Sequence, residues 1–183
     1  MEIKIEKLKQ CDIEIVSEIA SQIFINDHYY TTIFNKENIK DKLFDIFYEC
    51  IKKTMSYGYA KVAYDSENKI CGFILFFDFN YVKEKNKEYF NEVFPIEDGL
   101  KELSDKMFEI TKNDNYMYLL SIGVLPNYRG NGISKLLINS MCTEFDNFKI
   151  ISDVSNPIMG YILDKSFNLK EGFEYNNLKI MHN

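Results

Sequence analysis

Apolar residues recur along the chain with two periods, about 2 and about 3.6 residues, and the changes between them mark the expected strands and helices. Residues 2–8 alternate as a strand does, and Asp12 is a suitable N-cap for a following helix. The apolar face of that helix is Val16, Ile19, Ala20, Ile23 and Phe24. A second helix is expected over residues 36–55, with one apolar face: Ile39, Leu43, Phe47, Cys50 and Ile51.

The neighbouring segments lack this helical period. Residues 26–32 are polar, aromatic and aperiodic, which predicts a loop. Residues 59–64 and 70–79 predict two strands, and the polar turn 65–68 joins them into an antiparallel hairpin.

A long connection, residues 80–115, separates this hairpin from the next strand and exceeds what a hairpin needs. Its helical positions are Leu100, Leu103, Met107 and Ile110. Nearer the C-terminus we expect a strand over residues 148–154, a short helix over 157–165 and a terminal hairpin over 172–181.

The most informative stretch is residues 116–145. Residues 116–124 form an apolar run of strand length, typical of a central strand covered on both faces. Gly123 near its end predicts a bulge, or a place where another backbone or a ligand comes close. Pro126 ends the strand, a glycine-containing turn follows, and apolar residues then return at helical spacing.

A strand, a glycine turn and a helix N-terminus together form an anion-binding arrangement. The first backbone N–H groups of a helix have no partner within the helix and lie at the positive end of its dipole. Gly130 and Gly132 allow close approach of an anion, and Arg129 adds charged donors. The turn matches neither a P-loop nor a dinucleotide fingerprint. An ordinary strand–turn–helix connection is the alternative.

This turn resembles the acyl-CoA-binding motif of the GNAT family of N-acetyltransferases, Arg/Gln-x-x-Gly-x-Gly/Ala after a strand ending in Val-x-Pro. Arg129 and Gly132 match the motif, whereas Ser134 replaces its last small residue. The resemblance implies that the pyrophosphate of acetyl-CoA lies on the turn and that Ile122 and Val124 pair with its pantetheine arm. The implied cofactor-binding residues are Ile122, Val124, Arg129, Gly130, Asn131, Gly132, Ile133, Ser134 and Asn156.

The resemblance also implies a fold and a reaction. The fold would be α/β, with a mixed, mostly antiparallel sheet, flanked by helices, whose central parallel strands are splayed around acyl-CoA. A family tyrosine often protonates the departing thiolate, but aligned on Asn156 that position is Leu163. Tyr161 lies two residues earlier, about 160° away around a helix. Either Tyr161 replaces the acid through a local shift, or it is a core residue.

Weaker candidates would line an acceptor site: His28, Tyr29, Tyr30 and Asp78. We also expect residues 80–115 to fold over the acceptor side together with residues 27–32; the alternative is a helical excursion that covers the edge of the sheet.

Composition adds limits on compartment and partners. A chain of 183 residues predicts one domain, and its N-terminus lacks the apolar core of a signal peptide. Scattered cysteines indicate reduced thiols in a cytoplasmic protein and no metal site. The net charge of −6 disfavours nucleic acid as a partner. No apolar run is long enough to span a membrane. The sequence is compatible with either a monomer or a homodimer.

The sequence therefore predicts an N-acetyltransferase that moves the acetyl group of acetyl-CoA to a small-molecule or peptide primary amine by direct attack in a ternary complex. The alternative is a non-catalytic acyl-CoA sensor or interaction module with the same fold. The identity of the amine cannot be derived from these residues.

Overall fold

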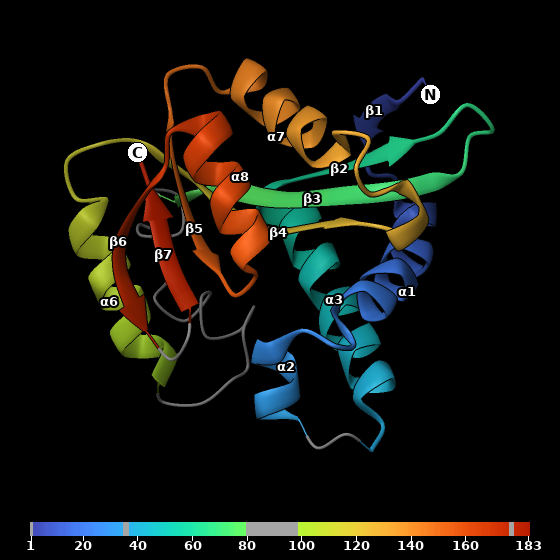
Figure 1. Ribbon diagram of the computed structural model, residues 1–183, viewed down its shortest axis with the longest axis horizontal. Helices are drawn as coiled ribbons and strands as arrows, with labels where there is room; N and C mark the ends of the chain where they lie inside the picture. The colour runs from blue at the N-terminus through green and yellow to red at the C-terminus, as the bar shows by residue number, and fades with distance from the viewer. Residues whose placement is uncertain (1, 35–36, 80–98, 176–177) are drawn as a thin grey trace.

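The computed structural model describes residues 2–34, 37–79, 99–175 and 178–183 (Figure 1). Among them, seven strands form one sheet in the order β1-β2-β3-β4-β5-β7-β6. The strands are β1 (Lys4–Lys7), β2 (Tyr59–Tyr64), β3 (Ile70–Asp78), β4 (Tyr116–Val124), β5 (Lys149–Val154), β6 (Lys170–Tyr175) and β7 (Leu178–His182). Neighbouring strands are antiparallel except β4 and β5, which are parallel.

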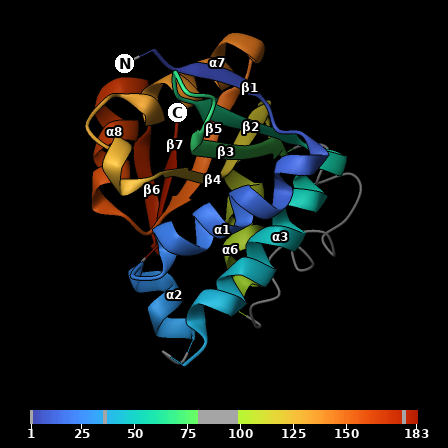
Figure 2. The ribbon, with the colours of Figure 1, turned by 90° about the vertical axis from the view of Figure 1, so that its right-hand side faces the viewer.

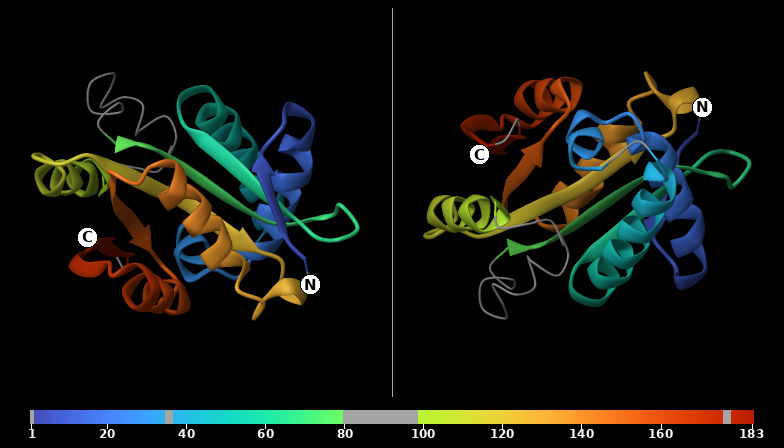
Figure 3. Two further views of the ribbon diagram at one scale, coloured as in Figure 1. Left: turned by 90° about the horizontal axis from the view of Figure 1, so that it is seen from above. Right: turned by 90° about the horizontal axis from the view of Figure 1, so that it is seen from below.

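Helices cover both faces of this sheet, as the views along it show (Figure 3). They are α1 (Ile13–Phe24), α2 (His28–Ile33), α3 (Ile39–Tyr57), α6 (Gly99–Ile110), α7 (Ile133–Glu144) and α8 (Pro157–Phe167), with short 3-10 turns η1 (Gln10–Asp12) and η2 (Pro126–Tyr128). The apolar faces of α1, α3 and α6 pack on one side in a first core. The apolar faces of α7 and α8 pack on the other side in a second core.

The expected fold class is confirmed, and most elements lie where the hydrophobic pattern predicted them. The hairpin β2–β3, the central strand β4 and the terminal hairpin β6–β7 match within a few residues. Strand β4 is nearly completely buried, as its uninterrupted apolar sequence requires.

The prediction of a loop at residues 26–32 is wrong, because residues His28–Ile33 form α2. Asp27 caps this helix, since its carboxylate accepts a hydrogen bond from the Tyr29 N–H at 3.0 Å. The ring of Tyr30 packs 5.8 Å from that of Phe24 and 6.0 Å from that of Phe47. A helix of six residues is too short to show a period, so the cap and this packing decide it.

A bulge does occur in β4, but at Leu120 and not at Gly123. Leu75 pairs with Ser121 and Phe76 with Leu119, so Leu120 is the extra residue. The bulge reverses the faces of the strand: Tyr116 and Tyr118 belong to the first core, whereas Ile122 and Val124 contact the second.

Gly123 is required by close packing. A Cβ there would lie 2.7 Å from a ring carbon of Phe73 and 2.9 Å from Ile23 Cδ1. The expectation for this glycine was a bulge, or the close approach of another backbone or a ligand; the close neighbours are instead these two side chains.

The helix predicted in the long connection is confirmed as α6. Residues 80–98, which belong to the segment expected to fold over the acceptor side, lie outside the described residues. Leu103 and Met107 of α6 are buried in the first core. Phe108 packs 5.1 Å from Phe79, and Lys106 lies over the ring of Phe173 at 5.5 Å. This helix therefore covers the sheet beside β3 and β6.

Candidate active site

The parallel strands β4 and β5 separate along their length (Figures 1 and 3). Their register consists of Tyr116 with Lys149, Met117 with Ile150, and Tyr118 with Ile151, and it ends there. One residue further, the Ser152 hydroxyl donates to the Leu119 carbonyl at 3.0 Å, so a side chain replaces the backbone pairing. Beyond this point β4 continues beside β3, and β5 continues beside β7.

The edge of β4 that β5 leaves carries backbone polar groups. The Leu125 N–H donates to the Cys71 carbonyl of β3 at 3.0 Å. Because successive residues of a strand direct their N–H and C=O groups to opposite sides, those of Ile122 and Val124 point away from β3. Both residues were predicted to contact pantetheine, and their backbone groups face the side where an extended chain could pair.

The loop after β4 presents an open helix N-terminus. Gly130 has φ 80° and Gly132, the N-cap of α7, has φ 75°, both in the left-handed region that favours glycine. Among the described residues no side chain caps α7, and its first turn holds no acidic residue. A Cβ on either glycine would meet nothing within 4 Å. The N–H groups at the start of α7, including those of Ile133 and Ser134, therefore stay available to an anion.

Side chains brace this loop from within. The Arg129 Nε donates to the Val124 carbonyl at 3.2 Å, which fixes the arginine beside the strand end. The Asn131 amide donates to the Tyr128 carbonyl at 3.0 Å, and the Tyr128 hydroxyl donates to Asp65 at 2.6 Å. Asn131 thus stabilises the turn with its side chain, and Arg129 keeps its terminal nitrogens for another acceptor.

Helix α8 begins directly after β5 and holds the remaining candidates. The Asn156 side chain caps this helix by accepting from the Ile158 N–H at 2.9 Å, so its amide NH₂ is left as a donor. Tyr161 is 65% exposed, which excludes a core role, and Leu163 is fully buried, which leaves no acid at the usual family position.

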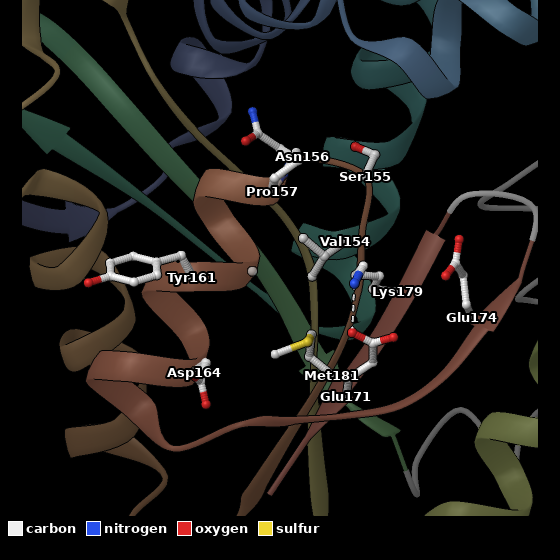
Figure 4. Close-up of a pocket in the computed structure, with 11 residues that line it drawn as sticks. Val154, Ser155, Asn156, Pro157, Tyr161, Asp164, Glu171, Glu174, Lys179 and Met181 are labelled. Atoms are coloured by element: carbon white, nitrogen blue, oxygen red, sulfur yellow. Dashed lines mark hydrogen bonds and ion pairs between the residues drawn. The ribbon is translucent and has the colours of Figure 1, made fainter.

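A cavity of about 540 Å³ lies between α8 and the terminal hairpin. Residues from β5, α8, β6 and β7 line it, among them Val154, Asn156, Tyr161 and Met181. On its hairpin side Lys179 is paired with Glu171 at 2.7 Å. Figure 4 shows the Tyr161 side chain directed away from this ion pair.

The predicted acceptor residues are only partly brought together. Helix α2 packs near the exit of β5, because the Ser155 hydroxyl donates to Asp27 at 3.0 Å (Figure 2). His28 is exposed, while Tyr29 and Tyr30 pack against the first core. Asp78 alternates with Phe77 and Phe79, which belong to that core, so it faces the opposite side of the sheet. Asp78 therefore does not join Tyr29 and Tyr30.

Sequence reasoning missed Asp153, the partly buried carboxylate that follows Ser152 on β5. The Tyr118 hydroxyl donates to its Oδ1. Burial raises the pKa of Asp153, and the hydrogen bond from Tyr118 opposes that rise. Burial, with the charge of Asp153, raises the pKa of Tyr29 to about 12. The available signal was an acidic residue in an otherwise apolar strand, KIISDV.

These features define a class of protein. A mostly antiparallel sheet, whose parallel pair separates beside a glycine-rich helix N-terminus, is the architecture of acetyltransferases that use acyl-CoA. The family model described as "Acetyltransferase (GNAT) family" matches residues 23–156, and the chain belongs to this family.

Solved structures agree with this assignment at the level of the fold. One is described as histone acetyltransferase HPA2 and related acetyltransferase from Corynebacterium glutamicum (TM-score 0.73, 15% identity, 100% of this chain and 95% of that chain covered). Another is arylalkylamine N-acetyltransferase 2 from Aedes aegypti (TM-score 0.70, 18% identity, coverage 100% and 99%). A third is the PaiA N-acetyltransferase from Thermoplasma acidophilum, in complex with coenzyme A (TM-score 0.63, 16% identity, coverage 100% and 98%). The chain has no match among curated protein sequences.

Proposed function

We propose that this protein is an N-acetyltransferase that transfers the acetyl group of acetyl-CoA to a primary amine by direct attack in a ternary complex. The observation that carries the proposal is the open N-terminus of α7 at the end of a strand that has lost its parallel neighbour. Family membership supports acyl transfer in general, and the coenzyme A complex of the Thermoplasma acidophilum relative supports the cofactor.

The residues of the loop fit a pyrophosphate. Its two glycines leave their outer face open, the helix dipole favours an anion, and Arg129 is the cation beside it. We assign pairing with the pantetheine arm to the backbone groups of Ile122 and Val124, and a further hydrogen bond to it to the Asn156 amide. When bound, acetyl-CoA supplies a thioester carbonyl as the electrophile.

The protein then has two proton transfers to manage. The amine has to lose a proton, because only its neutral form attacks the thioester. A backbone N–H on the open edge of β4 stabilises the oxyanion, and the C–S bond breaks to release CoA thiolate. With a pKa of about 8.5 this thiol is a tolerable leaving group, so an acid helps without being obligatory. We assign this role to Tyr161, whose exposed hydroxyl is free to act.

A small amine with an apolar body suits the acceptor side. The start of α2 places His28, Tyr29 and Tyr30 near the exit of β5, and aromatic rings dominate this region. The arylalkylamine acetyltransferase from Aedes aegypti shares this fold, which is consistent with such an acceptor.

No helix within the described ranges is long and apolar enough to cross a membrane. We place the reaction in the cytoplasm.

A binding module without catalysis is the second candidate. The observation in its favour is Leu163, which is buried where the family tyrosine would stand. In this case CoA would bind to the same loop, but no amine would be acylated.

Thiol release measured with acetyl-CoA and a panel of amines separates the two candidates. The panel should include phenethylamine, a polyamine, an amino acid and a peptide with a free N-terminus. We expect amine-dependent release of CoA, with the acetylated amine identified by mass spectrometry. Micromolar binding of CoA by calorimetry without turnover of any amine would favour the binding module instead.

A further inference from the structure

We propose that Asp153, held in place by Tyr118, receives the protonated acceptor amine and removes its proton. This inference rests on the proposed amine acetylation and assigns the proton acceptor of that reaction.

The position of Asp153 follows from the separation of β4 and β5. The last register pair is Tyr118 with Ile151, so Asp153 lies two residues beyond it, where β5 no longer has β4 beside it. Alternation along β5 gives Asp153 the same face as Ile151, which belongs to the first core. This is also the face of Tyr118, Tyr29 and Tyr30. Asp153 therefore lies at the separation, on the side opposite α7 and α8.

Within the described residues, Asp153 has a hydrogen-bond donor but no cationic partner. Within the described residues, the Tyr118 hydroxyl is its only side-chain donor, and no Lys, Arg or His forms an ion pair with it. A carboxylate can accept about four hydrogen bonds, so most of its capacity is unused. A shielded carboxylate without a cation is energetically costly, and an arriving ammonium would relieve that cost.

The groups that surround Asp153 are neutral or acidic. Tyr118 of β4, Tyr29 and Tyr30 of α2, and Cys50 of α3 interact electrostatically within one cluster. Asp27, the N-cap of α2, also contributes to this cluster. Burial raises the pKa of both Tyr118 and Tyr30, so their hydroxyls stay neutral donors. The raised pKa of Asp153 makes it a stronger base than an exposed aspartate.

The aromatic rings define the rest of the acceptor. The rings of Tyr29 and Tyr30 are 5.3 Å apart, and those of Phe77 and Phe79 lie 5.0 and 5.9 Å from that of Tyr118. Ring faces attract cations and bury apolar groups. A carboxylate within such a cluster favours a primary ammonium on an apolar or aromatic body.

The proton transfer balances without a further reagent. The Asp153 carboxylate takes one proton from R–NH₃⁺, which gives R–NH₂ and a neutral carboxylic acid. The amine nitrogen forms the bond to the thioester carbonyl carbon, the C–S bond breaks, and CoA thiolate leaves. Tyr161 gives its proton to the thiolate, the second N–H proton restores Tyr161 through water, and Asp153 loses its proton to solvent when the amide departs.

Asp153→Asn is the principal test, with Asp146→Asn, an exposed carboxylate in the turn before β5, as the matched control. We expect kcat/KM for phenethylamine to fall about 10²- to 10⁴-fold in Asp153→Asn, the usual range for loss of a general base. The Kd for CoA should stay within about twofold and the Tm should be unchanged or higher, because the variant removes a shielded charge. Asp146→Asn should match the parent. Activity of Asp153→Asn within about threefold of the parent would overturn the proposal.

Tyr118→Phe provides a readout that a purely structural pair would not give. The hydrogen bond from Tyr118 lowers the pKa of Asp153, so its loss should move the acidic limb of the kcat/KM profile to higher pH. If Asp153→Asn fails to fold, Tyr118→Phe tests the role of Asp153 in its place. An acidic limb of the kcat/KM profile at the same pH as in the parent would then refute that role.

Failure of the role of Asp153 can be distinguished from failure of the proposed acetylation. If the parent acetylates no amine, calorimetric binding of phenethylamine to the CoA complex replaces turnover as the readout. At least tenfold weaker binding to Asp153→Asn than to the parent would support an ammonium site at Asp153, and equal binding or none to either would overturn it.

Discussion

Replacing Gly132 by alanine tests whether the N-terminus of α7 binds the pyrophosphate of CoA. Gly132 has φ 75°, where a residue with a Cβ costs about 1–2 kcal/mol. A Cβ there meets nothing within 4 Å, so no clash adds to this cost. For a chain of this length the expected decrease in Tm is about 2–8 °C.

The expected effect on CoA has a separate cause. The new methyl group occupies open space at the N-cap of α7, where we place the pyrophosphate. Loss of one hydrogen bond to a charged group costs about 1.5–3 kcal/mol, which corresponds to an increase in Kd of about tenfold to over a hundredfold. Calorimetry with CoA and thermal unfolding measure the two effects independently.

Asn168→Ala is the matched control, because Asn168 also has a positive φ, 56°. Asn168 is the C-cap of α8, at the opposite end of that helix from Asn156. It should lower the Tm through the same kind of backbone strain and leave the Kd for CoA unchanged. If Gly132→Ala lowers the Tm but binds CoA as tightly as the parent, the pyrophosphate does not lie on this turn.

Three further predictions concern the same site. Arg129→Ala should weaken CoA binding by about tenfold to over a hundredfold through loss of a charge-assisted contact, and an unchanged Kd in calorimetry would contradict this. Tyr161→Phe should lower turnover while leaving the affinity for acetyl-CoA nearly intact; equal turnover from pH 6 to 9 with a weakly reactive amine would show that the thiolate leaves unaided. The pKa of Asp153 is higher in the folded state than in the unfolded state. Between pH values of about 3.9, the ordinary aspartate pKa, and the raised pKa, the folded protein therefore binds more protons than the unfolded protein. The contribution of Asp153 to stability should therefore be lost as pH rises through that window, and denaturant titrations should show the parent losing stability relative to Asp153→Asn there; parallel curves would refute it.

Elements with local signals can be located from the amino-acid sequence alone. Strand β4, the turn with Gly130 and Gly132, and the start of α7 follow from an apolar run, a proline, two glycines and a helical period within one continuous stretch. These signals depend on backbone sterics and on contacts a few residues apart, so they survive without knowledge of the rest of the chain. The candidate CoA loop was predictable for this reason.

Contacts between residues distant in sequence are visible only in the folded chain. Asp153 and Tyr118 are 35 residues apart, and Ser155 and Asp27 are 128 apart. The bulge at Leu120 arises in the pairing with β3, and it determines which side chains face α7.

Neither the position at which β4 and β5 separate nor the formation of α2 has a local pattern. Register and packing carry little local information, because the energy of such contacts is gained only when distant segments meet. On the proposed acceptor side, the sequence pointed to Asp78, which faces the other side of the sheet, and gave no sign that Asp153 lies beside Tyr118.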